Sequence, residues 1–233
     1  MASFRALYDG DLDTPPRAAV RKTIIEQFQR LYYHSADTTW RDTWYRGVRV
    51  WKCPLDLWLY QEILHDVRPA LIVETGTAFG GSAYFLGDVC ELLGRGQVVS
   101  IDIRPQPDRP EHSRVTYLTG SSTAPEIVAR VRALLPAERA DSSVLVILDS
   151  DHARDHVLAE LRAYGPMVTV GSYAIVEDTI VNGNPLYPSF GPGPMEAVDA
   201  YLAETEVFVV DESKHKFLQT FNPRGYLRKV GAS

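Results

Sequence analysis

The chain has 233 residues, 45% of them hydrophobic and 23% charged, which is enough for one large α/β domain with a substantial core. Its formal net charge of -6 excludes the global positive field that attracts nucleic acid or anionic lipid. No apolar run is long enough to cross a bilayer, and the N-terminal MASFRALYDGDLDTPPRAAVRK lacks the apolar core of a secretory signal. We therefore expect a soluble, cytoplasmic protein that binds neither nucleic acid nor membrane.

Residues 1–54 differ from the rest of the chain in their sequence pattern and in their high density of aromatic residues. Thr23 to Tyr33 reads as an amphipathic helix, and the aromatic-rich TTWRDTWYRGVRVWKCPLDLW follows it. Aromatic residues at this density favour a packed segment over a disordered one. We expect residues 1–54 to form a helical and aromatic appendage that covers a substrate or contacts another subunit.

Residues 55–233 alternate short apolar strands with helices. Helices are predicted at 55–67, 82–93, 125–135, 155–164 and 195–204, and strands at 70–76, 97–103, 115–120, 143–149, 172–178, 206–211 and 217–229. This order is typical of a Rossmann-like, doubly wound, mostly parallel sheet of seven strands, closed by an antiparallel C-terminal hairpin. The loop at 179–194 is too rich in proline and glycine for regular structure, and it is either a lid over a site or a simple connection.

A glycine-rich turn, LIVETGTAFGGS, joins the first of these strands to a helix. Gly76, Gly80 and Gly81 let the backbone approach a ligand closely, and ligands of open parallel sheets bind at the carboxyl ends of the strands. Asp102 ends the next strand, where a carboxylate can accept hydrogen bonds from both hydroxyls of a ribose. The sequence therefore predicts a ligand that contains a ribose, the alternative being a tight turn without a ligand.

The spacing of the turn narrows the choice of ligand. The dinucleotide fingerprint would need glycine at Ala78, and a phosphate-binding P-loop would need the missing G-K-[ST]. Glu74, at the end of the strand, suits a cationic ligand better than a pyrophosphate. S-adenosylmethionine has an amino group, a sulfonium and a ribose, so we predict that it binds here. The predicted cofactor-binding residues of the turn are Glu74, Gly76, Thr77, Gly80, Gly81 and Ser82.

Carboxylates end two further strands. Asp149 follows one, and Glu177 with Asp178 ends the next; in this topology they converge, and without a cation they would raise one another's pKa. Three oxygen ligands predict magnesium, or else manganese or calcium, although such carboxylates can also cap helices, as Asp151 could. His152 is the candidate catalytic base for a hydroxyl held by the metal, unless it only forms hydrogen bonds.

Two other metal chemistries find little support. His152 and His156 have the H-x-x-x-H spacing of a zinc pair, but Ala153 stands where H-E-x-x-H has its glutamate. None of the six histidines is followed two residues later by an acid, so the two-histidine, one-carboxylate iron triad is also missing.

These motifs resemble known enzymes. Residues 55–230 resemble class I S-adenosylmethionine methyltransferases, and LDSDH and VEDT resemble the metal ligands of magnesium-dependent catechol and caffeoyl-coenzyme A O-methyltransferases. In those, a lysine stands where His152 does, and Asp-Asn replaces Glu177-Asp178. The chain is more similar to the bacterial cephalosporin hydroxylase and rhamnosyl O-methyltransferase family over WYRGVRVWKCPLDLWLYQEIL, RPALIVETGTAFGGSAYF, ILDSDHARDHVLAEL and GSYAIVEDTIVNG.

The resemblance implies an oligomeric, magnesium-dependent O-methyltransferase that acts on a sugar hydroxyl of a glycoside or antibiotic precursor. In this hypothesis Asp149 and His152 are catalytic, Ser121 and Ser122 lie near the adenine, and Lys52 contacts substrate or pairs with a carboxylate. Methoxylation of a β-lactam, and a non-catalytic partner protein with the same fold, are the alternatives.

Overall fold

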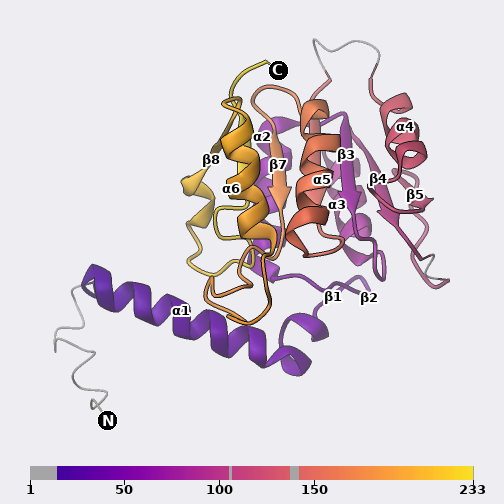
Figure 1. Ribbon diagram of the computed structural model, residues 1–233. Helices are drawn as coiled ribbons and strands as arrows, with labels where there is room; N and C mark the ends of the chain where they lie inside the picture. The colour runs from indigo at the N-terminus through magenta and orange to yellow at the C-terminus, as the bar shows by residue number, and fades with distance from the viewer. Residues whose placement is uncertain (1–14, 105–106, 137–141, 233) are drawn as a thin grey trace.

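The computed structural model describes residues 15–104, 107–136 and 142–232 (Figure 1). Its centre is a seven-stranded sheet with the order β5-β4-β3-β6-β7-β9-β8. The strands are β3 (Leu71–Thr75), β4 (Gln97–Asp102), β5 (Val115–Thr119), β6 (Val144–Leu148), β7 (Tyr173–Val176), β8 (Phe208–Val210) and β9 (Tyr226–Lys229). Strands β3 to β7 pair in parallel, whereas β9 runs antiparallel to both β7 and β8. This is the Rossmann-like sheet with an antiparallel end that the sequence predicts.

The central strands β3 and β6 are buried along their whole length. β6 is a continuous apolar run and β3 begins as one, as expected for strands that are covered on both faces, although β3 ends in the buried Glu74 and Thr75. Successive side chains point to opposite faces, so Ile72 and Ile147 contribute to one hydrophobic core while Val73, Val146 and Leu148 contribute to the other.

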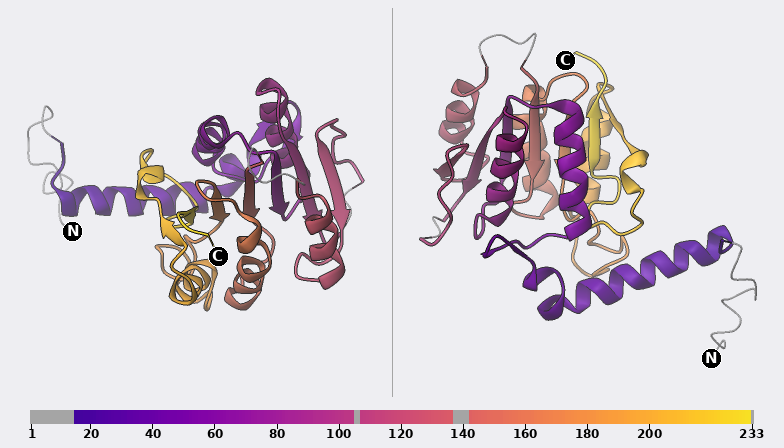
Figure 2. Two further views of the ribbon diagram at one scale, coloured as in Figure 1. Left: turned by 90° about the horizontal axis from the view of Figure 1, so that it is seen from above. Right: turned by 180° about the vertical axis from the view of Figure 1, so that it is seen from behind.

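Helices cover both faces of the sheet, as the view from above in Figure 2 makes clear. One layer consists of α4 (Pro125–Ala133), α5 (Arg154–Tyr164) and α6 (Pro194–Glu204), and the other of α2 (Pro54–Val67) and α3 (Gly81–Leu92). The three-layer arrangement leaves the carboxyl ends of the parallel strands at one edge, next to the N-terminal segment.

The N-terminal segment begins with α1 (Ala18–His34), which extends away from the sheet and reaches the body near its C-terminal end (Figures 1 and 2). Two short helical turns, η2 (Ala36–Thr38) and η3 (Trp40–Asp42), lead into a hairpin of β1 (Trp44–Tyr45) and β2 (Val48–Arg49). A small apolar cluster of Trp40, Cys53, Ile180, Val181, Leu186 and Phe221 joins this segment to the body. Within the described residues, no helix combines the length and apolar character that a membrane span needs.

Two details differ from the sequence predictions. Of the predicted strand at 217–229, only Tyr226–Lys229 pairs with the sheet, because Pro223 lacks a donor and residues 219–225 fold back over the end of β7. The predicted helix cap at Asp151 is also wrong. Asp151 Oδ1 accepts a hydrogen bond from Ala153 N at 2.7 Å and closes a turn before α5, whose N-terminus has no side-chain cap.

Candidate active site

Two adjoining cavities open at the carboxyl ends of β3, β4 and β6. One has a volume of about 350 Å³ and the other about 430 Å³, and Gly76, Asp102 and Ser150 line both. The first cavity also reaches Trp40, Trp51 and Tyr33 of the N-terminal segment. Residues at the carboxyl ends of the parallel strands and residues of the aromatic appendage therefore enclose one space.

The glycine turn is packed tightly between its neighbours. Gly76 has φ +83°, and a Cβ there would lie 1.8 Å from the carbonyl oxygen of Asp149, so position 76 accepts only glycine. A Cβ at Gly81 would lie 2.2 Å from Arg49 O in the β1–β2 hairpin. Of the predicted turn residues, Gly76, Thr77, Gly81 and Ser82 line the 350 Å³ cavity.

The two predicted carboxylates of the cofactor site have different surroundings. Asp102 lines both cavities, and its Oδ2 accepts a hydrogen bond from Ala78 N at 2.9 Å. Glu74 is fully buried and lines neither cavity; its Oε2 accepts from Ser100 Oγ at 2.6 Å, and burial raises its pKa. Ser100 Oγ lies 2.7 Å from Thr77 Oγ1, which links Glu74 to the turn. Glu74 Oε1 is buried without a hydrogen-bond partner among the described residues.

The 430 Å³ cavity contains Ser121, Ser122 and His156. His156 Nε2 lies 3.2 Å from Ser122 Oγ and 3.1 Å from Ser150 Oγ. His152 instead lines the 350 Å³ cavity. The two histidines of the H-x-x-x-H spacing therefore face different spaces, which agrees with the weak support for zinc.

A group of two acids and one histidine lines the 350 Å³ cavity. Asp149, His152 and Asp178 each offer an atom that can bind a metal, and these atoms lie within 4.8 Å of one another. His152 Nε2 is 3.2 Å from Asp178 Oδ2. Burial opposes the charged imidazolium, but Asp178 and Asp149 outweigh it and raise the pKa of His152. Asp178 Oδ1 is buried and has no hydrogen-bond partner in the described part of the chain, so it is free to bind a cation.

Glu177, the third predicted metal ligand, is buried and does not line the cavity, and its carboxylate is not among the candidate ligand atoms that lie within 4.8 Å of one another, where His152 stands instead. Glu177 Oε1 accepts a hydrogen bond from Tyr60 OH at 2.8 Å and forms an ion pair with Lys52. Lys52 Nζ also lies 2.7 Å from Asp149 Oδ2. Of the two roles the sequence left open for Lys52, the structure therefore has it pairing with carboxylates.

Burial and charge act against each other at Lys52. The side chain is 2% exposed, which penalises its positive charge, but Asp149, Glu177 and Glu74 outweigh this penalty and raise its pKa. Burial is also the main effect on Asp149 and Glu177, and it raises the pKa of both carboxyls. A positive charge between them therefore stabilises the group, whether a lysine or a metal ion supplies it.

Sequence reasoning missed Tyr60 and Asn222, which support this group. Tyr60 contacts Glu177, and Asn222 Oδ1 accepts a hydrogen bond from Asp178 N at 3.1 Å. One signal was available for Tyr60: with Asp56 it places two polar groups one turn apart on the buried face of α2. Asn222 follows no pattern, because it lies in a turn near the C-terminus.

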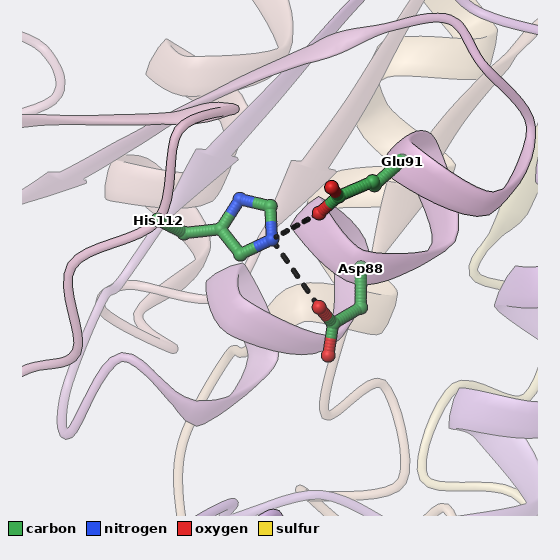
Figure 3. A group of neighbouring side chains, drawn as sticks. All are labelled: Asp88, Glu91 and His112. Atoms are coloured by element: carbon green, nitrogen blue, oxygen red, sulfur yellow. Dashed lines mark hydrogen bonds and ion pairs between the residues drawn. The ribbon is translucent and has the colours of Figure 1, made fainter.

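A second cluster of two acids and a histidine lines neither of the two cavities; it consists of Asp88, Glu91 and His112 (Figure 3). His112 Nδ1 accepts a hydrogen bond from Arg114 N at 3.0 Å, so the proton of the neutral ring is on Nε2, which lies 3.2 Å from Asp88 Oδ1. Asp88 also accepts hydrogen bonds from Arg46 and Tyr45. This cluster, which we call the clasp, joins α3 to the β1–β2 hairpin and to the loop before β5.

Comparison with known proteins identifies a family whose sequence pattern this chain matches. A family model for Rhamnosyl O-methyltransferase/CmcI matches residues 37–230. The rhamnosyl O-methyltransferase of Mycobacterium tuberculosis (strain ATCC 25618 / H37Rv) is 36% identical over 88% of this chain and 84% of its own length. The rhamnosyl O-methyltransferase of Mycobacterium leprae (strain TN) is 37% identical over 88% of this chain and 90% of its own length.

Solved structures have the same fold. A CmcI structure with Mg and SAM superposes with a TM-score of 0.63 and 24% identity, covering 82% of this chain and 78% of the other. The MycE methyltransferase of mycinamycin biosynthesis, with Mg and SAH, superposes with a TM-score of 0.52 and 16% identity, covering 88% of this chain and 53% of the other.

Proposed function

This chain belongs to the Rhamnosyl O-methyltransferase/CmcI family, and we propose that it is a magnesium-dependent O-methyltransferase that uses S-adenosylmethionine. The observation that carries the proposal is the 350 Å³ cavity, where the glycine turn and Asp102 face Asp149, His152 and Asp178. A methyl donor and a hydroxyl activated by a cation need such a pair of sites side by side.

The two adjoining cavities suit the two ends of S-adenosylmethionine. We place the adenosine in the 430 Å³ cavity beside Ser121 and Ser122, and the ribose against Asp102, which lines both cavities. The methionine part then follows Gly76, Thr77, Gly81 and Ser82. Glu74 and Gly80 line neither cavity, so we assign them to the support of the turn rather than to direct contact with the cofactor.

Asp149, Glu177 and Asp178 are the proposed ligands of Mg²⁺. All three offer hard oxygen atoms, and the buried Asp178 Oδ1 has no competing hydrogen bond among the described residues. Bound there, Mg²⁺ would supply the positive charge that lowers the pKa of the substrate hydroxyl. Lys52 pairs with Asp149 and Glu177 and balances part of their negative charge.

His152 is the proposed proton acceptor. It lines the same cavity as Asp149 and lies at hydrogen-bonding distance from Asp178, which orients its ring. In the proposed reaction the substrate oxygen forms a bond to the methyl carbon, the carbon–sulfur bond of the sulfonium breaks, and the hydroxyl proton passes to His152. S-adenosylhomocysteine and the methyl ether are the products.

We propose a rhamnosyl or related deoxysugar unit of a glycoside as the acceptor. The relatives from M. tuberculosis and M. leprae, both rhamnosyl O-methyltransferases, support a sugar substrate. Trp40, Trp51 and Tyr33 line the cavity and could stack on a sugar ring, which agrees with the appendage at residues 1–54 as a substrate cover. The loop at 182–193 would complete the enclosure.

A homo-oligomer also forms part of the proposal. Ile24, Phe28 and Leu31 are 43%, 49% and 65% exposed on α1. They are spaced four and three residues apart and so form one apolar stripe along a helix that extends from the body. We propose that a second copy of the chain covers this stripe, which size-exclusion chromatography with light scattering would test.

The central experiment measures the transfer of a labelled methyl group from S-adenosylmethionine to a panel of rhamnosides and other deoxysugar glycosides, with and without chelator. We expect transfer to at least one rhamnoside, loss of transfer with chelator, and recovery with Mg²⁺. Transfer that persisted unchanged in chelator would contradict the metal-dependent mechanism. A lack of S-adenosylmethionine binding in calorimetry would contradict the whole assignment.

A further inference from the structure

Asn222 is a fully buried polar residue that contacts Asp178 directly and is linked to Glu177 through Tyr60, these being the two consecutive acids that follow β7. Its Oδ1 accepts a hydrogen bond from the backbone N of Asp178 at 3.1 Å, and its Nδ2 donates to Tyr60 OH at 3.1 Å. Tyr60 OH in turn donates to Glu177. We propose that Asn222 is a positioning residue that presents Glu177 and Asp178 together to the cation, an inference that rests on the metal site proposed above.

Two consecutive acids need such help because of backbone geometry. Successive side chains of an extended strand point in opposite directions, so Glu177 and Asp178 can approach one cation only if the chain bends between them. Asp178 has φ +52°, a left-handed conformation that is costly for a residue with a Cβ. The hydrogen bond from Asp178 N to Asn222 is made at this bend and stabilises it.

Asn222 also determines the direction of the Tyr60 hydroxyl. A tyrosine hydroxyl has one proton to donate. Because Asn222 Nδ2 donates to the Tyr60 oxygen, the hydroxyl proton is left to point at Glu177 Oε1, 2.8 Å away. A single amide thereby fixes the backbone of one acid and the hydrogen-bond donor of the other.

The turn that carries Asn222 is itself anchored. Asp56 on α2 accepts hydrogen bonds from Phe221 N and from Tyr226 OH, both at 2.9 Å. On the other side, Thr179 Oγ1 donates to Pro223 O at 2.6 Å. The residues flanking Asn222 are therefore held both to α2 and to the segment after β7, which fixes the amide in place.

If Asn222 had only a structural role, its replacement would lower the stability of the fold without a specific loss of Mn²⁺ affinity. The distinction requires full-length Asn222→Ala and Tyr60→Phe, with Tyr173→Phe as the matched control. Tyr173 lies on β7 and its hydroxyl also donates to a carboxylate, Asp211 Oδ2, at 2.6 Å. The control therefore removes the same kind of hydrogen bond as Tyr60→Phe, from a tyrosine hydroxyl to a carboxylate, away from the cation site.

The experiment titrates each protein with Mn²⁺ by electron paramagnetic resonance, without substrate or cofactor, and measures the binding of S-adenosylhomocysteine by calorimetry. For Asn222→Ala we expect Mn²⁺ affinity to fall by about 10- to 100-fold, as for other residues that orient metal ligands. Tyr60→Phe should lower it by less, because the bond at Asp178 remains. Tyr173→Phe should bind Mn²⁺ as the wild type does, and all variants should keep the wild-type affinity for S-adenosylhomocysteine.

Wild-type Mn²⁺ affinity in both Asn222→Ala and Tyr60→Phe would overturn the inference while leaving the proposed function intact. Equal losses of Mn²⁺ and S-adenosylhomocysteine affinity would also overturn it, because they would indicate a general structural role. If Asn222→Ala does not fold, the Mn²⁺ affinities of Tyr60→Phe and Tyr173→Phe are compared by the same criterion, and wild-type affinity in Tyr60→Phe overturns the inference. A wild-type protein that bound no Mn²⁺ would refute the proposed metal site itself, and the inference with it.

Discussion

Among the residues that the structure describes, two groups bring two acids and one histidine within the reach of a metal ion, yet their surroundings are different. In the clasp, hydrogen bonds from Arg46 and Tyr45 outweigh the effect of burial and lower the pKa of Asp88. In the group of Asp149, His152 and Asp178, one buried carboxylate oxygen has no hydrogen-bond partner among the described residues, and all three residues line a cavity. The same residue types therefore support different roles.

The comparison teaches that the availability of lone pairs, rather than the number of acids, separates a candidate metal site from a structural clasp. An arginine in direct contact with Asp88 satisfies the carboxylate and fixes the hairpin. At the other group the cation that pairs with Asp149 is the lysine ammonium of Lys52, and Asp178 Oδ1 is left for another ligand. Paired substitutions in the two groups can test this distinction.

The largest expected effect is on Asp149. Asp149→Ala removes a proposed metal ligand, and we expect methyl transfer to fall by about 10³-fold or more, with loss of Mn²⁺ binding. The matched change Asp88→Ala should leave Mn²⁺ affinity at the wild-type value. Equal Mn²⁺ affinities of Asp149→Ala and Asp88→Ala would contradict the distinction between the candidate metal site and the clasp. Titration with Mn²⁺ and a labelled-methyl assay provide the measurements.

The histidines form the second pair. His152→Ala should lower kcat by about 10²-fold or more, because the proposed proton acceptor is lost, while the Kd for S-adenosylhomocysteine stays close to wild type. His112→Ala, in the clasp, should keep its kcat. A parallel loss of kcat and cofactor affinity in His152→Ala would reduce this residue to a structural role.

Lys52 tests how the acidic group is stabilised without metal. Lys52→Met leaves Asp149 and Glu177 buried without their cation, and we expect a loss of about 3 kcal/mol in the free energy of unfolding in the presence of chelator. Mg²⁺ should recover part of this loss. Urea unfolding with chelator and with Mg²⁺ measures both values, and an unchanged midpoint in chelator would contradict the prediction.

The smallest effect concerns pH and Asp56. Burial raises the pKa of this carboxyl from 3.8 to about 7, so the folded protein keeps the proton at pH values where the unfolded chain has lost it. Its contribution to stability is therefore complete below pH 3.8 and is lost as the pH rises towards 7. Relative to wild type, Asp56→Asn should gain stability between pH 4.5 and pH 7.5, by at most about 3 kcal/mol at about 1.4 kcal/mol for each pKa unit crossed. A difference between the two proteins that did not change with pH in urea unfolding would disprove this.

Sequence reasoning predicted those features that depend on a few neighbouring residues. The glycine turn, the strand end at Asp102 and the order of strands and helices follow from local patterns, and the sheet has the predicted topology. Sequence reasoning offered the pairing of Lys52 with a carboxylate as one alternative but did not identify Asp149, 97 residues away, as the partner. It missed the rest of the support, because those hydrogen bonds join Tyr60 to Glu177 and Asn222 to Tyr60, across 117 and 162 residues. Such contacts depend on packing that no local spacing encodes.

The close approach of Gly76 to the carbonyl of Asp149 has a consequence for protein engineering. Because even a methyl group at position 76 would collide with the chain after β6, the turn after β3 and the acid after β6 fit together as one backbone unit. A chimera that exchanged the cofactor-binding half of this fold with that of a relative would preserve the unit only if both strands came from the same parent. Recombination breakpoints between β3 and β6 should therefore yield few active hybrids, whereas breakpoints before α2 should be better tolerated.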